Sequence, residues 1–335
     1  MGRIVCFGEL MLRLTAPGRE LLLQGPSLDV HVGGAEANVA VGLARLGHAA
    51  AMVSRVPDSA LGDAAAGHLR RYGVSAESVV TGPGRMGLYF LAPGAGLRPS
   101  DIIYDRDGSS FALAPPADYD WDTLLDGADC LHLSGITPAL GDGPAEAALA
   151  AVQTARAKSI QVSFDGNYRE SLWRRRQIEP RPILAGLVGE TDLLFGNHRD
   201  ISLLLGRDFS DDGPARRREA AEAAFVAFPN LSLIASTARR VDDADCHRIA
   251  ARIDARDGAA QTEDVIVAGI VDRIGAGDAF AAGVLHGLRT GLDIEGTAQA
   301  GLALACLKHS LPGDASLFGQ RDIDAFLAGE RDVRR

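Results

Sequence analysis

The sequence VDRIGAGDAFAAGVLHGL, residues 271–288, places two glycines and an aspartate directly before a run of small residues with helical spacing. Glycine lets backbone N–H groups approach a ligand closely, and the first N–H groups of a helix attract anions. Gly275, Ala276 and Gly277 therefore form a candidate anion site. Asp278 is a poor phosphate ligand because like charges repel, but it suits a base that takes a proton from a hydroxyl attacking that phosphate. An aspartate is also an ordinary helix N-cap, and the motif alone fits both interpretations.

The rest of the chain alternates short apolar runs with helical patterns. Strands are expected at residues 3–8, 50–56, 129–135, 159–165, 192–197 and 231–237, and helices at 36–46, 62–72, 144–157, 199–205 and 214–227. Near-continuous apolar strands separated by helices predict an α/β fold with a doubly wound, mostly parallel sheet. Ligands of such sheets bind outside the carboxyl ends of the strands. The last third is expected to be helical, at 278–289, 294–309 and 322–328.

Two segments break the alternation. Residues 10–15 and 87–113 contain strand-like runs and turn residues without a helix between them. We expect a small antiparallel sheet that covers the site as a lid, formed by roughly residues 10–34 and 86–113 within a single domain spanning 1–335. The alternative is an extension of the main sheet without a function of its own.

Composition excludes several classes of protein. A net charge of −10 over 335 residues makes nucleic acid a poor partner. The sequence contains no apolar run of the ~18 residues that a membrane helix needs, so a cytoplasmic location is expected. The P-loop motif is absent, and the dinucleotide fingerprint fails at Phe280, which leaves an oxidoreductase only a weak fold analogy.

A second stretch changes the balance between the two interpretations of the glycine turn. HVGGAEANVAVGLARLG, residues 31–47, has a glycine pair leading into a helix with Asn38 one turn inside, which suits a polyhydroxylated ligand. Together the two stretches resemble the paired signatures of the ribokinase-like (PfkB) carbohydrate kinases, over nearly the whole chain. Within this family the sequence is most similar to kinases of 2-keto-3-deoxygluconate, through YDRDGSS (104–110), DGNYRESLW (165–173) and KHSLPGD (308–314).

This resemblance implies ATP-dependent phosphorylation of the 6-hydroxyl of that sugar acid, with Mg²⁺ bound chiefly by ATP phosphates and water and no protein metal site. It implies Asp278 as the base. The substrate contacts it implies are Gly34, Asn38, Tyr89, Tyr104, Arg106, Arg169, Asp278 and Asp314, and the nucleotide contacts are Asn167, Arg169, Asn197, Ser236, Gly275, Ala276 and Gly277. Arg106 and Arg169 are the candidates for the substrate carboxylate because arginine's planar fork matches that group. Asp314 either holds a substrate hydroxyl or orders the last loop.

The sequence departs from the broad family pattern at several positions. The string Asp272-Arg273-Ile274 stands where many relatives have two threonines, and Asp200 stands in a glutamate position near the expected Mg²⁺. ASTARR, residues 235–240, replaces a Lys-x-Gly string, and Ser236 and Arg239 there are expected to line the nucleotide site. The alternatives are a fructokinase- or ribokinase-type enzyme and a catalytically silent sugar-acid sensor. Pairing of two chains through the lid is expected, since exposed strand edges favour it.

Overall fold

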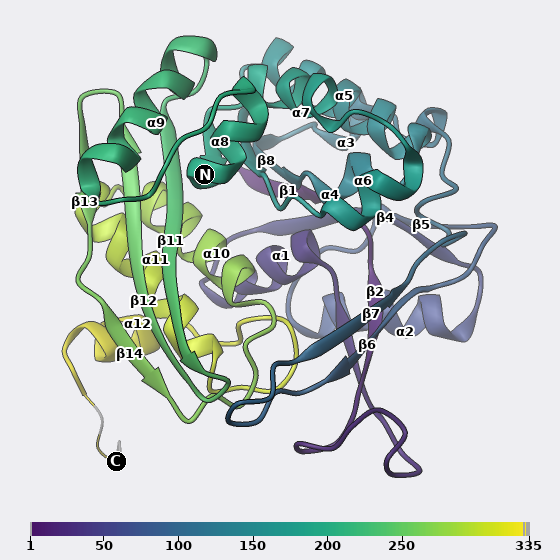
Figure 1. The fold of residues 1–335 in the computed structure, drawn as a ribbon. Helices are drawn as coiled ribbons and strands as arrows, with labels where there is room; N and C mark the ends of the chain where they lie inside the picture. Colours follow the sequence, from purple (N-terminus) through teal and green to yellow (C-terminus); the bar gives the residue numbers. More distant parts are fainter. Residues whose placement is uncertain (1, 331, 333–335) are drawn as a thin grey trace.

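The computed structural model of the chain describes residues 2–330 and 332, and its centre is a ten-stranded sheet (Figure 1). The strands run in the order β13 (Gly258–Gln261), β12 (Cys246–Ala255), β11 (Leu233–Asp243), β10 (Leu193–Phe195), β9 (Gln161–Asp165), β8 (Ala128–Ser134), β1 (Arg3–Phe7), β4 (Ala50–Pro57) and β5 (Val79–Gly82). A tenth strand, β14 (Val265–Ala268), pairs with β12. All neighbours from β11 to β5 are parallel, and the pairs that involve β12 are antiparallel. The predicted α/β fold with a mostly parallel sheet is confirmed.

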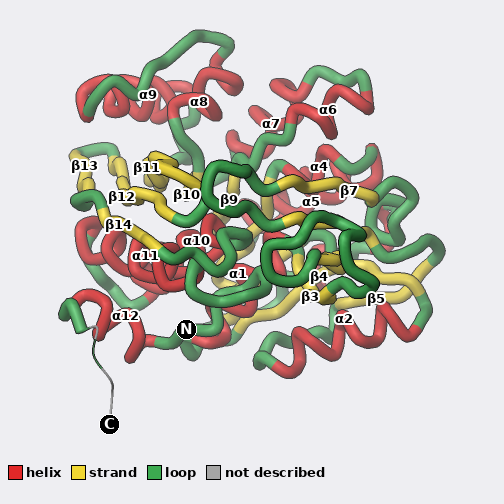
Figure 2. Tube along the Cα trace, turned by 60° about the horizontal axis from the view of Figure 1, so that its bottom comes forward, coloured by secondary structure: helices red, strands yellow, loops and turns green. Residues whose placement is uncertain are grey.

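Helices cover both faces of this sheet (Figure 2). One face carries α1 (Ala35–Arg45), α2 (Ala60–Arg71), α10 (Ala276–Arg289), α11 (Ile294–Lys308) and α12 (Gln320–Leu327). The other carries α5 (Asp142–Ala157), α7 (Pro180–Gly189), α8 (His198–Leu205) and α9 (Pro214–Ala227), with the shorter η1 (Pro116–Asp118), α3 (Trp121–Leu124), α4 (Ile136–Ala139) and α6 (Glu170–Arg176) near them. None of the helices that the structure describes combines the length and apolar character needed to cross a bilayer.

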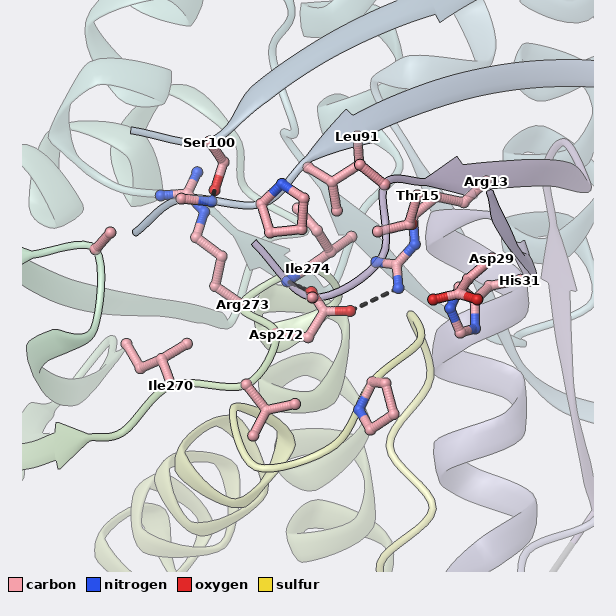
Figure 3. A pocket seen from close by; sticks show the side chains of 17 residues that line it. Arg13, Thr15, Asp29, His31, Leu91, Ser100, Ile270, Asp272, Arg273 and Ile274 are labelled. Carbon is pink, nitrogen blue, oxygen red and sulfur yellow. Dashed lines mark hydrogen bonds and ion pairs between the residues drawn. The ribbon is translucent and has the colours of Figure 1, made fainter. Parts of the chain in front are cut away.

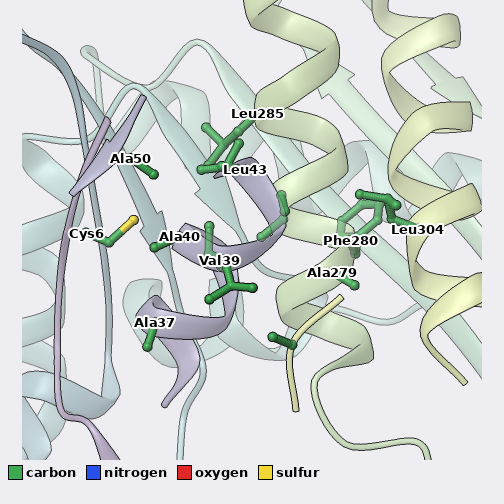
Figure 4. Close-up of a cluster of buried hydrophobic side chains, with 14 of the residues drawn as sticks. Cys6, Ala37, Val39, Ala40, Leu43, Ala50, Ala279, Phe280, Leu285 and Leu304 are labelled. Carbon is green, nitrogen blue, oxygen red and sulfur yellow. The ribbon is translucent and has the colours of Figure 1, made fainter. Parts of the chain in front are cut away.

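The strand sequences explain this layering. In β1, Ile4 and Cys6 pack with α1, α10 and α11, while Val5 and Phe7 pack against the opposite layer, because successive side chains in a strand point to opposite faces. Both sets are fully buried, which requires the near-continuous apolar run seen in the sequence. Figure 4 shows the first cluster, with Cys6 beside α1 and Phe280 between α10 and α11.

Four strands form a separate small sheet, hereafter the lid, in the order β3 (Asp29–Gly33), β2 (Met11–Thr15), β6 (Gly87–Ala92) and β7 (Asp101–Asp105). The predicted small lid sheet is therefore present, but it is not wholly antiparallel. β2 and β6 are parallel, since each enters the lid after leaving the main sheet, whereas β3 and β7 return as hairpin partners.

The prediction that the last third is helical is wrong between residues 246 and 268. β12, β13 and β14 occupy this stretch and precede the three expected helices. In β12, Arg252 and Asp254 are both buried and bond to each other at 2.6 and 2.7 Å. Because these two charged side chains are buried, the sequence of β12 looks like a polar segment and not like a buried strand. The helices at 170–176 and 180–189 were also not expected.

Candidate active site

The glycine turn forms the start of α10, as the sequence predicted. Gly275 has φ 78°, a left-handed conformation, and a Cβ there would lie 1.6 Å from the main-chain oxygen of Asp314. Gly277 is exposed and would place a Cβ in open space. The helix behind the turn is held close to α11, because a Cβ on Gly283 would meet the main-chain oxygen of Ala300 at 2.6 Å. Backbone N–H groups are thus presented to an open space at a rigidly packed helix start.

Asp278 lies in the first turn of α10, facing α1. Asn38 of α1 donates a hydrogen bond from Nδ2 to Asp278 Oδ2 at 2.7 Å, which brings together two residues 240 positions apart. Burial raises the pKa of Asp278 to about 8, and the carboxylates of Asp165, Glu36 and Asp314 act in the same direction, while the Asn38 bond opposes them. A carboxyl with a pKa near the working pH is suited to accept a proton during a reaction.

The glycine pair before α1 allows close packing of the lid on the body. A Cβ on Gly33 would lie 2.1 Å from Asp314 Oδ2, and one on Gly34, whose φ is 139°, would lie 2.2 Å from the main-chain oxygen of Glu9. Both glycines are buried. The absence of side chains is therefore explained by packing, whether or not Gly34 also contacts a ligand.

Side chains from the lid strands extend this site. Tyr89 and Tyr104 are directly paired across β6 and β7, with ring centroids 5.6 Å apart. The Tyr89 hydroxyl donates to Asp314 Oδ2, and Asp314 Oδ1 forms an ion pair with Arg13, a residue that the sequence reasoning did not single out. Both Asp314 oxygens are engaged within the protein, and these contacts order the last loop against the lid.

Arg106 is positioned by a buried carboxylate. Its Nε and Nη2 donate to Glu9 Oε2 at 2.8 and 2.5 Å, and the two side chains are 4% and 1% exposed. A ligand carboxylate that reached Arg106 would share the guanidinium with Glu9. Arg169, in contrast, is exposed and forms no ion pair among the described residues, although its charge opposes the rise in the pKa of Asp165 and of Asp200.

A cavity of about 720 Å³ opens beside the glycine turn, between α8, α9 and the β11–β12 ribbon. Five of the predicted nucleotide contacts line it, namely Arg169, Asn197, Ser236, Ala276 and Gly277, while Asn167 and Gly275 do not. Seven arginines and three aspartates contribute to its wall: Arg169, Arg199, Arg217, Arg239, Arg240, Arg248 and Arg252, with Asp211, Asp254 and Asp264. An excess of positive charge in a protein of net charge −10 favours a polyanionic ligand.

Several of these arginines were missed from the sequence, although they cluster in ARRREA (215–220) and ARR (238–240). Arg239 was expected there, and its pKa is lowered by burial and by nearby Arg273. Among the described residues, Arg169, Arg199, Arg239 and Arg273 form no ion pair with an acid. Unneutralised guanidinium groups that repel each other are suited to bind phosphates.

An acidic pair lies at the end of β9. Burial and the neighbouring Asp200 raise the pKa of Asp165 to about 7. Asp200 Oδ2 accepts the Asn197 N–H at 2.8 Å, so these two residues form the capping box that begins α8. Within the described part of the chain, no three His, Cys, Asp or Glu side chains converge as a metal site. The phosphates of a nucleotide would have to supply most ligands of a Mg²⁺ ion bound here.

A smaller cavity of about 160 Å³ lies between the lid and the loop that precedes α10 (Figure 3). Arg13, Thr15 and His31 line it from the lid, and Asp272 and Arg273 line it from the loop. In Figure 3 the Arg273 side chain points toward Ser100, the residue that precedes β7 of the lid.

Comparison with known proteins finds similar chains over almost the whole length of this one. Residues 1–318 match the pfkB family carbohydrate kinase model. The 2-dehydro-3-deoxygalactonokinase of Haloferax volcanii is 32% identical over 326 residues, covering 97% of this chain and 96% of its own. The crystal structure of 2-dehydro-3-deoxygluconokinase from Thermotoga maritima has a TM-score of 0.93 and 36% identity, covering 98% of this chain and 100% of its own. A structure described as a ribokinase II from Escherichia coli, solved with ATP and Mg²⁺, shares the fold at 18% identity, with a TM-score of 0.82 and coverage of 98% and 100%.

Proposed function

The chain belongs to the pfkB family of carbohydrate kinases, and from this premise we propose that it transfers the γ-phosphoryl group of ATP to the 6-hydroxyl of 2-keto-3-deoxygluconate or of its C4 epimer. The observation that carries the proposal is the Asn38–Asp278 pair at a bare glycine turn, directly beside an arginine-rich cavity of about 720 Å³. Both C4 epimers are included because the two relatives are named for different ones, a 2-dehydro-3-deoxygalactonokinase and a 2-dehydro-3-deoxygluconokinase.

The residues of the site divide the reaction between them. Asp278 accepts the proton of the 6-hydroxyl as its oxygen attacks the γ-phosphorus, and the bond to the bridging oxygen of ADP breaks. The N–H groups of residues 275–277 stabilise the charge on the transferred group, and the cavity arginines hold the remaining phosphates. Mg²⁺ supplies further charge neutralisation when bound with ATP; Asp165 and Asp200 are the nearby carboxylates that could contact its water shell.

The proposal is tested by ADP release from Mg-ATP in parallel reactions with 2-keto-3-deoxygluconate, its C4 epimer, fructose, ribose and gluconate. Turnover confined to the ketodeoxy acids supports the proposal, and their ratio identifies the preferred epimer. Preference for a neutral sugar would make the chain a fructokinase- or ribokinase-type enzyme. No turnover with any acceptor would favour the sugar-acid sensor.

Arg169 is proposed to bind the substrate carboxylate, because its guanidinium is exposed, lines the cavity and forms no ion pair among the described residues. For Arg169→Gln we expect the ratio of kcat/KM for the ketodeoxy acid to kcat/KM for a neutral sugar to fall about 10–100-fold, the value of one charge-assisted hydrogen bond. Arg174→Gln is the matched control, since Arg174 lies nearby on α6 but pairs with Glu170 on the surface. An unchanged ratio would assign Arg169 to the nucleotide phosphates alone.

The activity should depend on pH through Asp278. Its pKa in the unliganded protein is about 8, and only the ionised form is a base. We therefore expect kcat/KM to rise with pH, close to tenfold per unit well below pH 8, and to level off above it. Asn38→Ala should move this limb to higher pH, because the Asn38 hydrogen bond lowers the pKa of Asp278. A flat profile between pH 6 and 9 in both proteins would exclude Asp278 as the titrating base.

Two further features of the proposal concern the whole molecule. Both edge strands of the lid expose apolar side chains, Val30 on β3 at 59% and Ile103 on β7 at 52%, and we propose that two chains pair through this sheet.

The four cysteines form no disulfide, which fits a cytoplasmic location where ATP is available.

A further inference from the structure

Arg13 occupies the middle of the lid sheet. It lies on β2, directly paired with His31 of β3 on one side and with Tyr89 of β6 on the other. Its side chain is only 1% exposed, which is unusual for arginine and requires compensating charge.

That charge comes from outside the lid. Arg13 Nη2 donates to Asp272 Oδ2 at 2.6 Å, as Figure 3 shows, and Nη1 forms an ion pair with Asp314 Oδ1 at 2.9 Å. Among the described residues, Arg13 is the one cation that forms an ion pair with either carboxylate. Lys308, also buried, contacts main-chain oxygens instead, those of Asp272 and Leu311. Arg13 therefore gives both carboxylates their direct ion pair, while the charge of Lys308 acts on them from farther away.

Both residues adjoin the glycine turn, Asp272 through its carboxylate and Asp314 through its main chain. Asp272 Oδ1 accepts the N–H of Ile274 at 2.9 Å, and its Oδ2 accepts the N–H of Gly313 at 3.0 Å, so it fixes the backbone just before Gly275. Asp314 presents its main-chain oxygen against Gly275, in the space that a Cβ would fill. Arg13 is thus linked to the glycine turn in two ways. One link runs through Asp272, which precedes the turn, and the other runs through Asp314, which lies on the loop opposite it.

We propose that Arg13 is a positioning residue that couples the lid to the anion-binding turn, and that residues 275–277 keep their N–H groups directed at the transferred phosphoryl group only while this link is intact. The expected effect on catalysis rests on the proposed phosphoryl transfer. The coupling between the lid and the turn does not depend on it. A buried ion pair with a purely structural role is the competing explanation.

The test compares wild type, Arg13→Ala, Arg13→Lys and Arg85→Ala by steady-state kinetics and by amide hydrogen exchange. Arg85 is the matched control. It lies just before β6, and its ion-pair partner, Asp105, belongs to the lid, so the pair does not link the lid to the glycine turn. For Arg13→Ala we expect kcat to fall about 100-fold, comparable to losing an oxyanion-hole donor, with KM for the sugar changed less than about threefold. Exchange in the peptide covering 272–280 should accelerate at least about tenfold.

Two further measurements distinguish a positioning role of Arg13 from a purely structural one. Arg13→Lys keeps the positive charge but loses the planar fork whose two nitrogens contact separate carboxylates, so its kcat should lie between those of wild type and Arg13→Ala. Added guanidinium ion at millimolar concentration should raise kcat of Arg13→Ala about tenfold or more, since the 160 Å³ cavity adjoins the vacated space.

The outcomes are distinct. Unchanged exchange at 272–280, or a raised KM with unchanged kcat, would overturn the proposal. If wild type turned over no acceptor, the proposed function would fail, yet exchange in Arg13→Ala against Arg85→Ala would still decide the coupling.

Discussion

Asp278→Asn should lower kcat by about 10²–10⁴-fold, the usual contribution of a positioned base, with much smaller changes in ATP affinity. The amide cannot accept the 6-hydroxyl proton, but its oxygen can still accept the Asn38 hydrogen bond seen at 2.7 Å. The variant should therefore fold and bind both substrates. The measurement is ADP release under saturating ATP and ketodeoxy acid, with nucleotide affinity measured separately by calorimetry.

The same substitution should stabilise the protein. The pKa of Asp278 is raised from 3.8 to about 8 on folding, so the native state binds more protons than the unfolded state between these values. Stability of the wild type consequently falls as pH rises through this window. A neutral asparagine removes that loss, and the Tm advantage of the variant should be larger at pH 8.5 than at pH 5. Equal activity, or a variant less stable than wild type at pH 8.5, would contradict this assignment of Asp278.

Gly275→Ala should have the largest effect on stability. The residue has φ 78°, and a Cβ would lie 1.6 Å from the main-chain oxygen of Asp314, so backbone must move on one side or the other. We expect a loss of about 3 kcal/mol or more in the free energy of unfolding, measured by urea denaturation, together with loss of activity.

Gly277→Ala is the matched comparison within the same turn. Its Cβ would meet no atom within 4 Å, and the position is already helical, so stability should change by less than about 1 kcal/mol. The added methyl group would stand where a phosphate approaches, and ATP turnover should fall while the fold is intact. A Gly277→Ala variant with wild-type kcat would show that the phosphate does not approach this glycine.

The sequence was sufficient for the main architecture because its apolar periodicity matches burial. Residues 199–205, for example, were expected as a helix and lie within α8, whose buried Ile201 and Leu204 recur at helical spacing. The strand β12 was missed since its internal Arg252 and Asp254 neutralise each other inside the fold, which no local pattern reveals.

The site residues were likewise predictable where a local motif contains them and unpredictable where they depend on long-range contacts. Asp278 and the glycine turn were found because one local motif contains them. Arg13 was overlooked, since a single charge in LMLRLT is typical of a solvent-facing strand position, and its partners lie 259 and 301 residues away. The Glu9–Arg106 pair likewise joins two segments 97 residues apart, so Arg106 looked like a free cation in the sequence.

The arginine-lined cavity also has a kinetic consequence. A triphosphate far from this protein meets an object of net charge −10, whereas a triphosphate at the cavity mouth meets an excess of guanidinium groups. At physiological ionic strength the Debye length is about 8 Å, so the distant repulsion is largely screened, while the field inside the partly enclosed cavity persists. Salt at this concentration therefore weakens the long-range repulsion between the protein and the nucleotide more than it weakens the attraction inside the cavity. The distribution of charge, rather than its sum, sets how fast the nucleotide arrives.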